Sequence, residues 1–290
     1  MKRLNIIGAG KLGQTLAHLF HSQQLFRVES VINRSLSSAQ QAVDFIGAGQ
    51  AAEELRQAET ADIWLIATAD GDIDSVAQAL YSSEVFHGHE IVFHCSGSLA
   101  SDILHSASHS PPIASIHPIH SFAKPENSVR SFHGSYCAYE GDKAALDILL
   151  PAFEKLGAQL LAVNGEKKPI YHAASVMACN YLVALMDASL SCFEQAGIDR
   201  QQAQQLLLPI THATLDNTLQ GTPEQALTGP IARGDIDTVT AQLQQLKDLP
   251  SLDNIYRALG VQAVAIAKRL DSPNNLELLE KLLQENTNPV

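Results

Sequence analysis

The stretch that decides the fold is residues 4–13, which read LNIIGAGKLG. Its first four residues form an apolar strand pattern, its glycines follow G-x-G-x-x-G, and a helical pattern and a second strand pattern come next. This order predicts the βαβ unit that binds dinucleotides. In such a unit Gly8 permits the tight turn, Gly10 lets the backbone approach a pyrophosphate, and Gly13 lets the helix pack on the strand. The alternative is a glycine turn without a ligand.

The start of the helix supplies the rest of this phosphate site. Free backbone N–H groups and the positive end of the helix dipole favour bound phosphate. The residues expected to contact the cofactor in this loop are Gly8, Ala9, Gly10, Lys11, Leu12 and Gly13.

The end of the second strand indicates which dinucleotide is bound. NAD sites usually place Asp or Glu there, about 20 residues beyond the glycines, to bind the ribose 2′-hydroxyl. This chain has Asn33, Arg34 and Ser35 instead. An Arg fork with two short hydrogen-bonding side chains would hold a 2′-phosphate, which a carboxylate would repel. NADP(H) is therefore favoured over NAD(H), and the alternative is that Arg34 stands in solvent within a turn.

Composition limits the class of protein. The 290 residues carry a formal net charge of −12, are 46% hydrophobic and are 17% charged. The negative charge argues against nucleic acid or an anionic membrane as partner. No uninterrupted apolar run approaches the roughly 20 residues of a membrane span, and residues 4–7 already belong to the nucleotide fold, so no signal peptide is expected.

The cysteines and histidines complete this picture. The four cysteines show no C-x-x-C spacing and are expected to be reduced thiols that mostly fill the core, as in a cytoplasmic protein. Twelve histidines are present, and His117-x-x-His120 has the spacing of some ligand pairs. Pro118 between them prevents a regular helix, and no metal site is predicted.

Alternating strand and helix patterns through residue 165 predict an α/β fold with a doubly wound parallel sheet of the Rossmann type. The expected strands are 4–7, 27–32, 63–67, 90–94, 114–116, 135–139 and 158–163, and the expected helices are 11–22, 36–46, 72–81, 99–107 and 142–156. After residue 165 every pattern is helical: 169–196, 200–219, 223–227, 236–248, 252–269 and 275–285. The predicted domains are therefore a dinucleotide-binding domain, 1–165, and an all-α domain, 166–290, for substrate binding and dimerisation.

The loops after the later strands should face the cofactor, because ligands of open α/β sheets bind beyond the carboxyl ends of the strands. The residues predicted to line the cofactor there are Thr68, Ala69, Ser96 and Gly97. The segment after the next strand adds His117 and Ser121 as candidate substrate contacts.

The long helical pattern over 169–196 carries the candidate proton donor. His172, Val176 and Asn180 are spaced i, i+4, i+8 and share one face, flanked by Ser175. A nicotinamide reductase must protonate the atom that it reduces. His172 could act as the general acid and Asn180 could hydrogen-bond a substrate carbonyl. The alternatives are a satisfied interdomain histidine and an asparagine at a buried helix contact.

A second constellation lies in the loop 227–235, which reads LTGPIARGD. Asp235 is placed to cap the next helix. Arg233 then stands at a helix entrance, where the dipole does not favour a cation. Binding a substrate carboxylate or a cofactor phosphate would explain Arg233. Pairing with Asp235 or Asp237 for loop rigidity is the alternative.

Together these pieces resemble the superfamily of two-domain reductases that includes ketopantoate reductases, 3-hydroxyisobutyrate and 6-phosphogluconate dehydrogenases and pyrroline-5-carboxylate reductases. Within it the chain most resembles Rossmann-like proteins with a C-terminal domain of unknown function, which are often labelled as candidate NADP or coenzyme F420-dependent oxidoreductases. The matching segments are 8–13, 95–98, 117–118, 172–181 and 227–235. The resemblance implies a helical domain like the C-terminal domain of 6-phosphogluconate dehydrogenase, a cytosolic NADP-linked reductase, and a homodimer formed through the helical domain.

The resemblance also implies a small-molecule substrate, with ketopantoate or a related oxoacid as the leading candidate. The hydroxyacid dehydrogenases and ketopantoate reductases use a Lys on the long helix with an Asn four residues later. Here that face has His172 and Val176, only Asn180 matches, and the nearest lysines, Lys167 and Lys168, precede the helix. Reduction of an imine, as in pyrroline-5-carboxylate reductases, and a non-catalytic NADP-binding regulatory protein are the alternatives.

Overall fold

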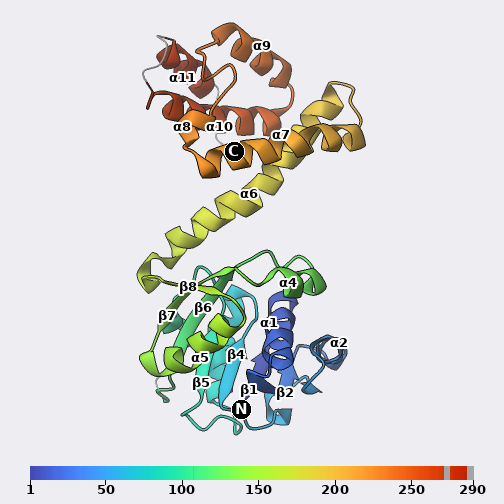
Figure 1. The fold of residues 1–290 in the computed structure, drawn as a ribbon, viewed down its shortest axis with the longest axis vertical. Coiled ribbons are helices and arrows are strands. Elements are labelled where there is room, and N and C mark those ends of the chain that lie inside the picture. Colours follow the sequence, from blue (N-terminus) through green and yellow to red (C-terminus); the bar gives the residue numbers. More distant parts are fainter. Residues whose placement is uncertain (107, 271–274, 286–290) are drawn as a thin grey trace. The chain divides into compact units, whose positions relative to one another are not determined.

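The computed structural model describes residues 1–106, 108–270 and 275–285 (Figure 1). The chain divides into two compact units, Met1–Met177 and Ala178–Val290. The division falls inside one long helix, α6 (Lys168–Gln195), whereas the sequence pattern places the domain boundary in front of that helix. The first turns of α6 therefore pack with the first unit.

The first unit is built on one eight-stranded sheet with the order β3-β2-β1-β4-β5-β6-β7-β8. The strands are β1 (Lys2–Ile7), β2 (Phe26–Ile32), β3 (Gln50–Ala52), β4 (Ile63–Ile66), β5 (Ile91–His94), β6 (Ile113–Ile119), β7 (Tyr136–Gly141) and β8 (Gln159–Ala162). All neighbours pair in parallel except β6 and β7, which are antiparallel. The chain reverses its direction of travel across the sheet between β1 and β4, which is the switch point of a doubly wound fold. The predicted fold class is confirmed.

Helices cover the sheet in the predicted places, with two exceptions. The α-helices are α1 (Lys11–Ser22), α2 (Leu36–Ile46), α3 (Ile73–Tyr81), α4 (Pro125–Ser131) and α5 (Lys143–Lys155), and the short 3-10 turns are η1 (Leu55–Gln57), η2 (Asp70–Asp72), η3 (Ser101–Leu104) and η4 (Gly165–Lys167). Strand β3 and helix α4 were not predicted. The helix expected over 99–107 is wrong: only η3 forms, because the Ser101 N–H and hydroxyl both donate to the Glu140 carboxylate, at 2.7 and 2.6 Å. Residue 107 lies outside the described part.

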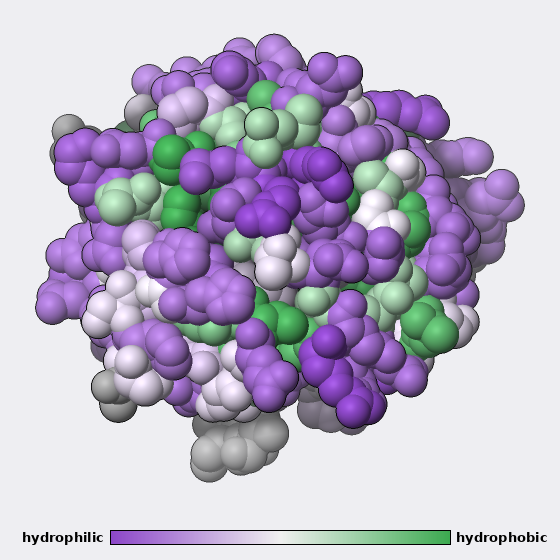
Figure 2. Space-filling model, turned by 90° about the horizontal axis from the view of Figure 1, so that it is seen from below, coloured by the Kyte–Doolittle hydropathy of each residue, from purple (hydrophilic) through white to green (hydrophobic). Residues whose placement is uncertain are grey.

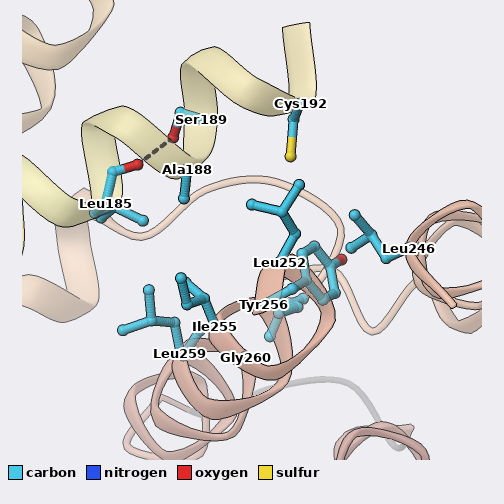
Figure 3. Close-up of a pocket in the computed structure, with 12 residues that line it drawn as sticks. Leu185, Ala188, Ser189, Cys192, Leu246, Leu252, Ile255, Tyr256, Leu259 and Gly260 are labelled. Atoms are coloured by element: carbon cyan, nitrogen blue, oxygen red, sulfur yellow. Dashed lines mark hydrogen bonds between the residues drawn. The ribbon is translucent and has the colours of Figure 1, made fainter. Parts of the chain in front are cut away.

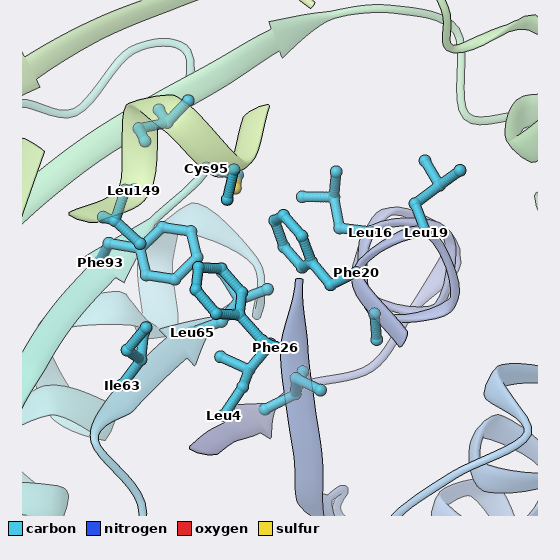
Figure 4. Packing of buried hydrophobic residues seen from close by; sticks show 14 of the residues in the cluster. Leu4, Leu16, Leu19, Phe20, Phe26, Ile63, Leu65, Phe93, Cys95 and Leu149 are labelled. Carbon is cyan, nitrogen blue, oxygen red and sulfur yellow. The ribbon is translucent and has the colours of Figure 1, made fainter. Parts of the chain in front are cut away.

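Alternate strand residues fill two apolar layers, one on each face of the sheet. Ile63 and Leu65 of β4 pack with α1 and α5, whereas Trp64 packs with α3 on the other face. Figure 4 shows the first layer, where the Phe20 ring lies 5.0 Å from the ring of Phe26. Both layers are closed to water, so the sheet is a rigid platform for the loops at its ends.

The second unit is all-helical, as predicted. Beyond α6 it contains α7 (Arg200–Gln220), α8 (Pro223–Ala226), α9 (Ile236–Leu246), α10 (Pro250–Ala267) and α11 (Leu276–Gln284). Val239, Val264 and Leu279 are fully buried in its small core. The Arg257 guanidinium donates to the carbonyl oxygens of Leu282 and Glu285, at 2.9 and 2.7 Å. This arginine satisfies the carbonyl groups at the end of α11, where a helix leaves acceptors unpaired.

The sequence analysis expected no apolar segment of membrane-spanning length, and α6 requires a correction. The segment Gly165–Gln195 is long and apolar enough to cross a bilayer by length and composition alone, although polar residues such as His172 and Asn180 interrupt its apolar runs. One such helix is weak evidence for a membrane protein, because the helices of protein cores and interfaces pass the same test. On the face in Figure 2, hydrophobic residues are interspersed among hydrophilic ones.

The cysteines are free but do not mostly fill the core. Cys95 and Cys137 are buried in the first unit, whereas Cys179 and Cys192 are exposed. The expectation was wrong for the last two because α6 is mostly exposed along its length, so an apolar helical pattern there did not mean burial.

The burial of Phe20 in the core predicts that its removal destabilises the first unit. Phe20→Ala should lower its free energy of unfolding by about 3–5 kcal/mol, because the substitution leaves a cavity between α1 and α5. The fluorescence of Trp64, the only tryptophan and fully buried, reports unfolding of this unit in urea. The half-exposed Leu36→Ala is the control and should change stability by about 0.5 kcal/mol or less. An equal urea midpoint for the two variants would contradict the described core.

Candidate functional site

The glycine loop has the geometry that its sequence predicts. Gly8 has a φ of +85°, and a Cβ there would lie 2.6 Å from Thr68 Cγ2, so only glycine fits this turn. A Cβ on Gly13 would lie 3.2 Å from the Ala67 Cβ, which is close helix–strand packing. A Cβ on Gly10 would have no atom within 4 Å. The backbone at Gly10 is therefore open to an approaching ligand.

Asn33 at the end of β2 makes a contact that the sequence did not predict. Its side-chain oxygen accepts a hydrogen bond of 2.7 Å from the Ala9 N–H and so fixes the glycine loop. Ser35 accepts from the Ser38 N–H at 3.3 Å and caps α2. Arg34 is exposed and makes no ion pair with any residue that the structure describes. Of the three, Arg34 is the side chain with no ion pair among the described residues, and Asn33 keeps its amide Nδ2 as a free donor.

The loop after β4 joins the glycine loop to the loop after β5. Thr68 packs under Gly8, and two residues later the Asp70 carboxylate accepts from the Ser96 and Ser98 hydroxyls, at 2.7 and 2.8 Å. The Thr68 Oγ1 atom is buried and has no hydrogen-bond partner within the described chain. The carboxyl ends of β1, β4 and β5 thus form one continuous edge with an unpaired hydroxyl in it.

His94, the last residue of β5, is fully buried behind this loop. Its Nδ1 accepts from the Ser96 N–H at 3.1 Å and its Nε2 donates to the Ala100 carbonyl oxygen at 3.1 Å. Burial first, and then the nearby Lys168 charge, lower the pKa of His94 to about 4. His94 is therefore a neutral structural histidine with its proton on Nε2.

Two other histidines converge above Gly97. A Cβ on Gly97 would lie 2.3 Å from His172 Nδ1 and 2.9 Å from His117 Nε2. The two rings are 5.4 Å apart and nearly perpendicular. His172 Nδ1 is buried and lacks a hydrogen-bond partner among the described residues. Any side chain at this position would collide with both rings, so glycine lets the two imidazoles pack against the β5 loop, and the two residues predicted from separate segments share one site.

A tyrosine forms a hydrogen bond with one ring nitrogen of His117. The Tyr171 hydroxyl lies 2.9 Å from His117 Nδ1. When this hydroxyl donates, neutral His117 carries its own proton on Nε2, the nitrogen beside Gly97. Burial, followed by the neighbouring His172 and Lys168, lowers the pKa of His117 to about 4, and burial raises the pKa of Tyr171 to about 12. Near neutral pH this pair is uncharged.

Lys168 is a residue of the site that the sequence reasoning set aside. Its side chain is 1% exposed, and its ammonium donates to the Ser96 carbonyl oxygen at 2.9 Å and to the Ser115 hydroxyl. It also pairs with Glu140 at 3.7 Å. Burial lowers the pKa of Lys168, and Glu140 opposes this effect. The sequence signal was its position one helical turn before His172, but adjacent Lys167, which is exposed, has nearly the same spacing.

The remaining residues that the sequence predicted for the site lie on α6 and in two loops. Ser121 is exposed in the loop after β6, and Ser175 is half-buried one turn after Tyr171 on α6. Asn180 is exposed on α6 in the second unit, as is Arg233 in the loop before α9. Asp235 caps α9 as predicted, accepting from the Thr238 N–H at 3.0 Å and from its hydroxyl at 2.7 Å.

The second unit contains an apolar hollow of about 270 Å³ between α6 and α10. Figure 3 shows Leu185 and Cys192 of α6 facing Leu252 and Tyr256 of α10. None of the residues that the sequence predicted for the site lines this hollow. Across residues 1–106, 108–270 and 275–285, no group of three His, Cys, Asp or Glu side chains could hold a metal ion.

Two domain families match the sequence. A family described as a Rossmann-like domain matches residues 2–118, and one described as a domain of unknown function, DUF2520, matches residues 135–263. The chain combines a Rossmann-like domain with a DUF2520 domain. The DUF2520 match begins before β7, so this domain's segment includes Lys168, Tyr171 and His172. Among curated proteins none matches the chain significantly.

Several solved structures are similar in fold over most of this chain. A protein named as a candidate NADP oxidoreductase, from Bacteroides fragilis, is 20% identical with a TM-score of 0.77, over 92% of this chain and 98% of its own. Protein TM1727 from Thermotoga maritima is 26% identical with a TM-score of 0.69 over the same shares. Pyrroline carboxylate reductase from Plasmodium falciparum, solved with NADP bound, is 15% identical with a TM-score of 0.56, over 97% and 98%. These likenesses support the fold.

The buried neutral histidines predict how the Rossmann-like domain responds to acid. The pKa values of His94 and His117, both about 4, lie below the value of about 6.5 expected in the unfolded chain. The unfolded state therefore binds more protons between these values, and stability is full above about pH 6.5 and falls as the pH drops toward 4. Urea midpoints from Trp64 fluorescence should be lower at about pH 4.5 than at about pH 7.

His94→Gln should reduce this pH dependence, whereas His87→Gln, at an exposed position, should leave it unchanged. A wild-type midpoint that stays constant over this range would contradict the buried neutral histidines.

Proposed function

We propose that the protein is an NADP(H)-dependent oxidoreductase that reduces a small carboxylated oxo compound. The observation that carries the proposal is the convergence of His117 and His172 above Gly97, on the same sheet edge as the glycine loop. A dinucleotide lying along this edge, with its phosphates at Gly10, would bring its far end toward the two imidazoles. Such an arrangement suits transfer of a hydride and a proton to one substrate.

The residues along the carboxyl edge of the sheet fit an NADP(H) cofactor. The N-terminus of α1 has no side-chain cap, so its first amides are left for a pyrophosphate. Thr68 Oγ1 is a buried hydroxyl without a partner in the described chain. The residues that would hold the cofactor are Gly8, Ala9, Gly10, Lys11, Leu12, Gly13, Thr68, Ala69, Ser96 and Gly97. Ala9 would act through its position in the loop, because Asn33 already accepts from its N–H.

The 2′-phosphate would lie at the end of β2. Arg34 is exposed, and Ser35 stands at the start of α2 beside it. Asn33 uses its side-chain oxygen on Ala9, which leaves its amide Nδ2 as a donor toward a phosphate. A carboxylate at these three positions, as NAD sites have, is absent from the sequence.

The histidines would handle the proton. When bound, the nicotinamide would supply the hydride. His117, held neutral by burial, would donate a hydrogen bond from Nε2 to the substrate oxygen and polarise it. His172 would be the general acid, since its Nδ1 lies beside His117 over Gly97 and has no hydrogen-bond partner among the described residues. By donating to Nδ1, Tyr171 would keep His117 in the tautomer whose proton is on Nε2, beside Gly97.

The substrate residues come from both domains in this proposal. Arg233 would bind a carboxylate and Asn180 a carbonyl, with Ser175 and Ser121 as further polar contacts. Ketopantoate or a related oxoacid fits a cation, an amide and two imidazoles. The proposed location is the cytoplasm.

Reduction of an imine is a second candidate. It is favoured by neighbours such as the Plasmodium falciparum pyrroline carboxylate reductase and a reductive aminase from Aspergillus terreus in complex with NADPH, which is 13% identical with a TM-score of 0.57. The same two imidazoles could protonate or polarise a nitrogen. A non-catalytic NADP-binding protein is the third candidate and requires that no substrate be turned over.

A homodimer formed through the helical domain is also proposed. Large apolar side chains stand exposed along α6 and α7: Met177, Tyr181, Val183, Leu206, Leu208, Ile210, Leu215 and Leu219. Apolar helix faces of this extent are usually buried against a partner.

The geometry of the glycine loop predicts that a substitution at Gly10 weakens cofactor binding without changing stability. Gly10→Ala should keep the wild-type stability, because its Cβ meets no atom within 4 Å, but should weaken NADPH binding at least about tenfold by obstructing the pyrophosphate. Arg34→Ala should weaken NADPH but leave NADH affinity unchanged. Titrations followed by cofactor fluorescence measure both. Equal wild-type affinity for NADPH and NADH would contradict the assignment of the 2′-phosphate site.

The proposed roles of His117 and His172 predict how their replacement changes kcat. Wild-type protein should oxidise NADPH with a member of a panel of oxoacids and cyclic imines, and His172→Gln should lower kcat by about 10²–10⁴-fold with little change in NADPH affinity. His117→Gln should lower kcat as well. His89→Gln, at an exposed position, is the control and should keep full activity. Unchanged turnover in His172→Gln would refute its role as acid, and tight NADPH binding without any turnover would favour the non-catalytic candidate.

A further inference from the structure

The ammonium of Lys168 stands at the junction of four elements of the first unit. It donates to the Ser96 carbonyl oxygen in the β5 loop and to the Ser115 hydroxyl of β6, and it pairs with Glu140 of β7. Lys168 itself is the first residue of α6. These partners are acceptors on every side, which are the surroundings that a buried ammonium requires.

Each partner of Lys168 is next to a part of the histidine site. Ser96 precedes Gly97, and Ser115 lies two residues before His117 on the same strand. On α6, His172 is four residues after Lys168 and therefore stands one turn above it. From α6, which carries His172, the cation thus contacts the segments that carry Gly97 and His117.

A second contact fixes the same end of α6. A Cβ on Gly165 would lie 3.2 Å from the Ala100 Cβ and 3.5 Å from the Glu140 carboxyl group, so η4 packs directly on η3 and β7. Glu140 in turn accepts from the Ser101 N–H and hydroxyl. The start of α6 is therefore held twice, by the contacts of Lys168 and by the packing of η4 against η3 and β7.

We propose that Lys168 is a positioning residue, whose buried ammonium ties the first turn of α6 to the β5 loop and to β6 and β7, and so sets how His172 and His117 face each other across Gly97. The role rests on the proposed function only in that the histidine pair is the proton-transferring group. Lys168 is not itself a proton donor in this role, since its ammonium is held by Ser96, Ser115 and Glu140.

The charge of Lys168 also acts on the imidazoles. The titratable groups that face His117 are His172, Tyr171 and Lys168 from α6 and Asp70 from η2, and those that face Lys168 are Glu140, Asp70, Cys95 and His94. Lys168 lowers the pKa of His117 and His94, whereas Asp70 raises it. Removing the cation should therefore raise the pKa of both histidines.

The test compares two adjacent lysines, of which one is buried and one exposed. Long-range ¹H–¹⁵N spectra of the histidine rings give the tautomer and the titration midpoint of His117 without any substrate. Lys168→Met should raise the titration midpoint of His117, because it removes a charge that lowers the pKa of this histidine, and it should shift the His172 ring signals. It should also lower kcat at least about tenfold with NADPH affinity nearly unchanged. Lys167→Met should change none of these.

Two outcomes overturn the proposal. One is a folded Lys168→Met protein whose His117 midpoint and His172 signals match the wild type. Because Lys168→Met leaves the Glu140 charge buried without its partner, Lys168→Met/Glu140→Gln removes both charges and is measured in the same way. The second outcome that overturns the proposal is unfolding of both variants. Lys168 would then be needed to hold the fold together, and a separate role in positioning the histidines would not be required. If His117 shifts as expected but wild-type protein reduces no substrate, the positioning role stands and the proposed function fails.

Discussion

The parallel pairing of β1, β4, β5 and β6 is the constraint on which the site depends. Parallel strands end on one edge, so segments far apart in the sequence are brought into line there: the glycine loop, the loop with Thr68 and Asp70, and the loop with Ser96 and Gly97. Each loop contacts the next, through Thr68 under Gly8 and through Asp70 on the two serines. An extended ligand therefore has a continuous track along one edge.

Opposite charges hold the β5 loop from two sides. Asp70 accepts from its serine hydroxyls, while Lys168 donates to its Ser96 carbonyl oxygen. Hydrogen bonds to charged groups are stronger than neutral ones, and a buried charge that loses its partner is costly. The loop is thus resistant to displacement at the point where Gly97 makes room for two imidazoles. A firmly held pair of imidazoles suits proton transfer, which depends on small distances.

The sequence was sufficient for the fold class, the roles of Gly8 and Gly13 and the cap at Asp235, because each follows from local periodicity or backbone geometry. It also singled out His117 and His172, though not their meeting above Gly97. Lys168 could not be recognised, since burial is a tertiary property and its neighbour Lys167 shares its local sequence. The bond from Ala9 to Asn33 was hidden for the same reason: it joins residues 24 apart along the chain. Antiparallel pairing of β7 depends on sheet partners that no local pattern specifies.

The central claim is that the proposed dinucleotide lies along the carboxyl edge from the glycine loop to the histidine pair. Backbone and imidazole NMR signals followed during titration with NADPH test it most directly. The account predicts that saturating NADPH shifts the amides of residues 8–13, 68–70 and 96–97 together with the ring signals of His117 and His172. Saturation that leaves these signals in place, or that shifts only signals of the second unit, would contradict it.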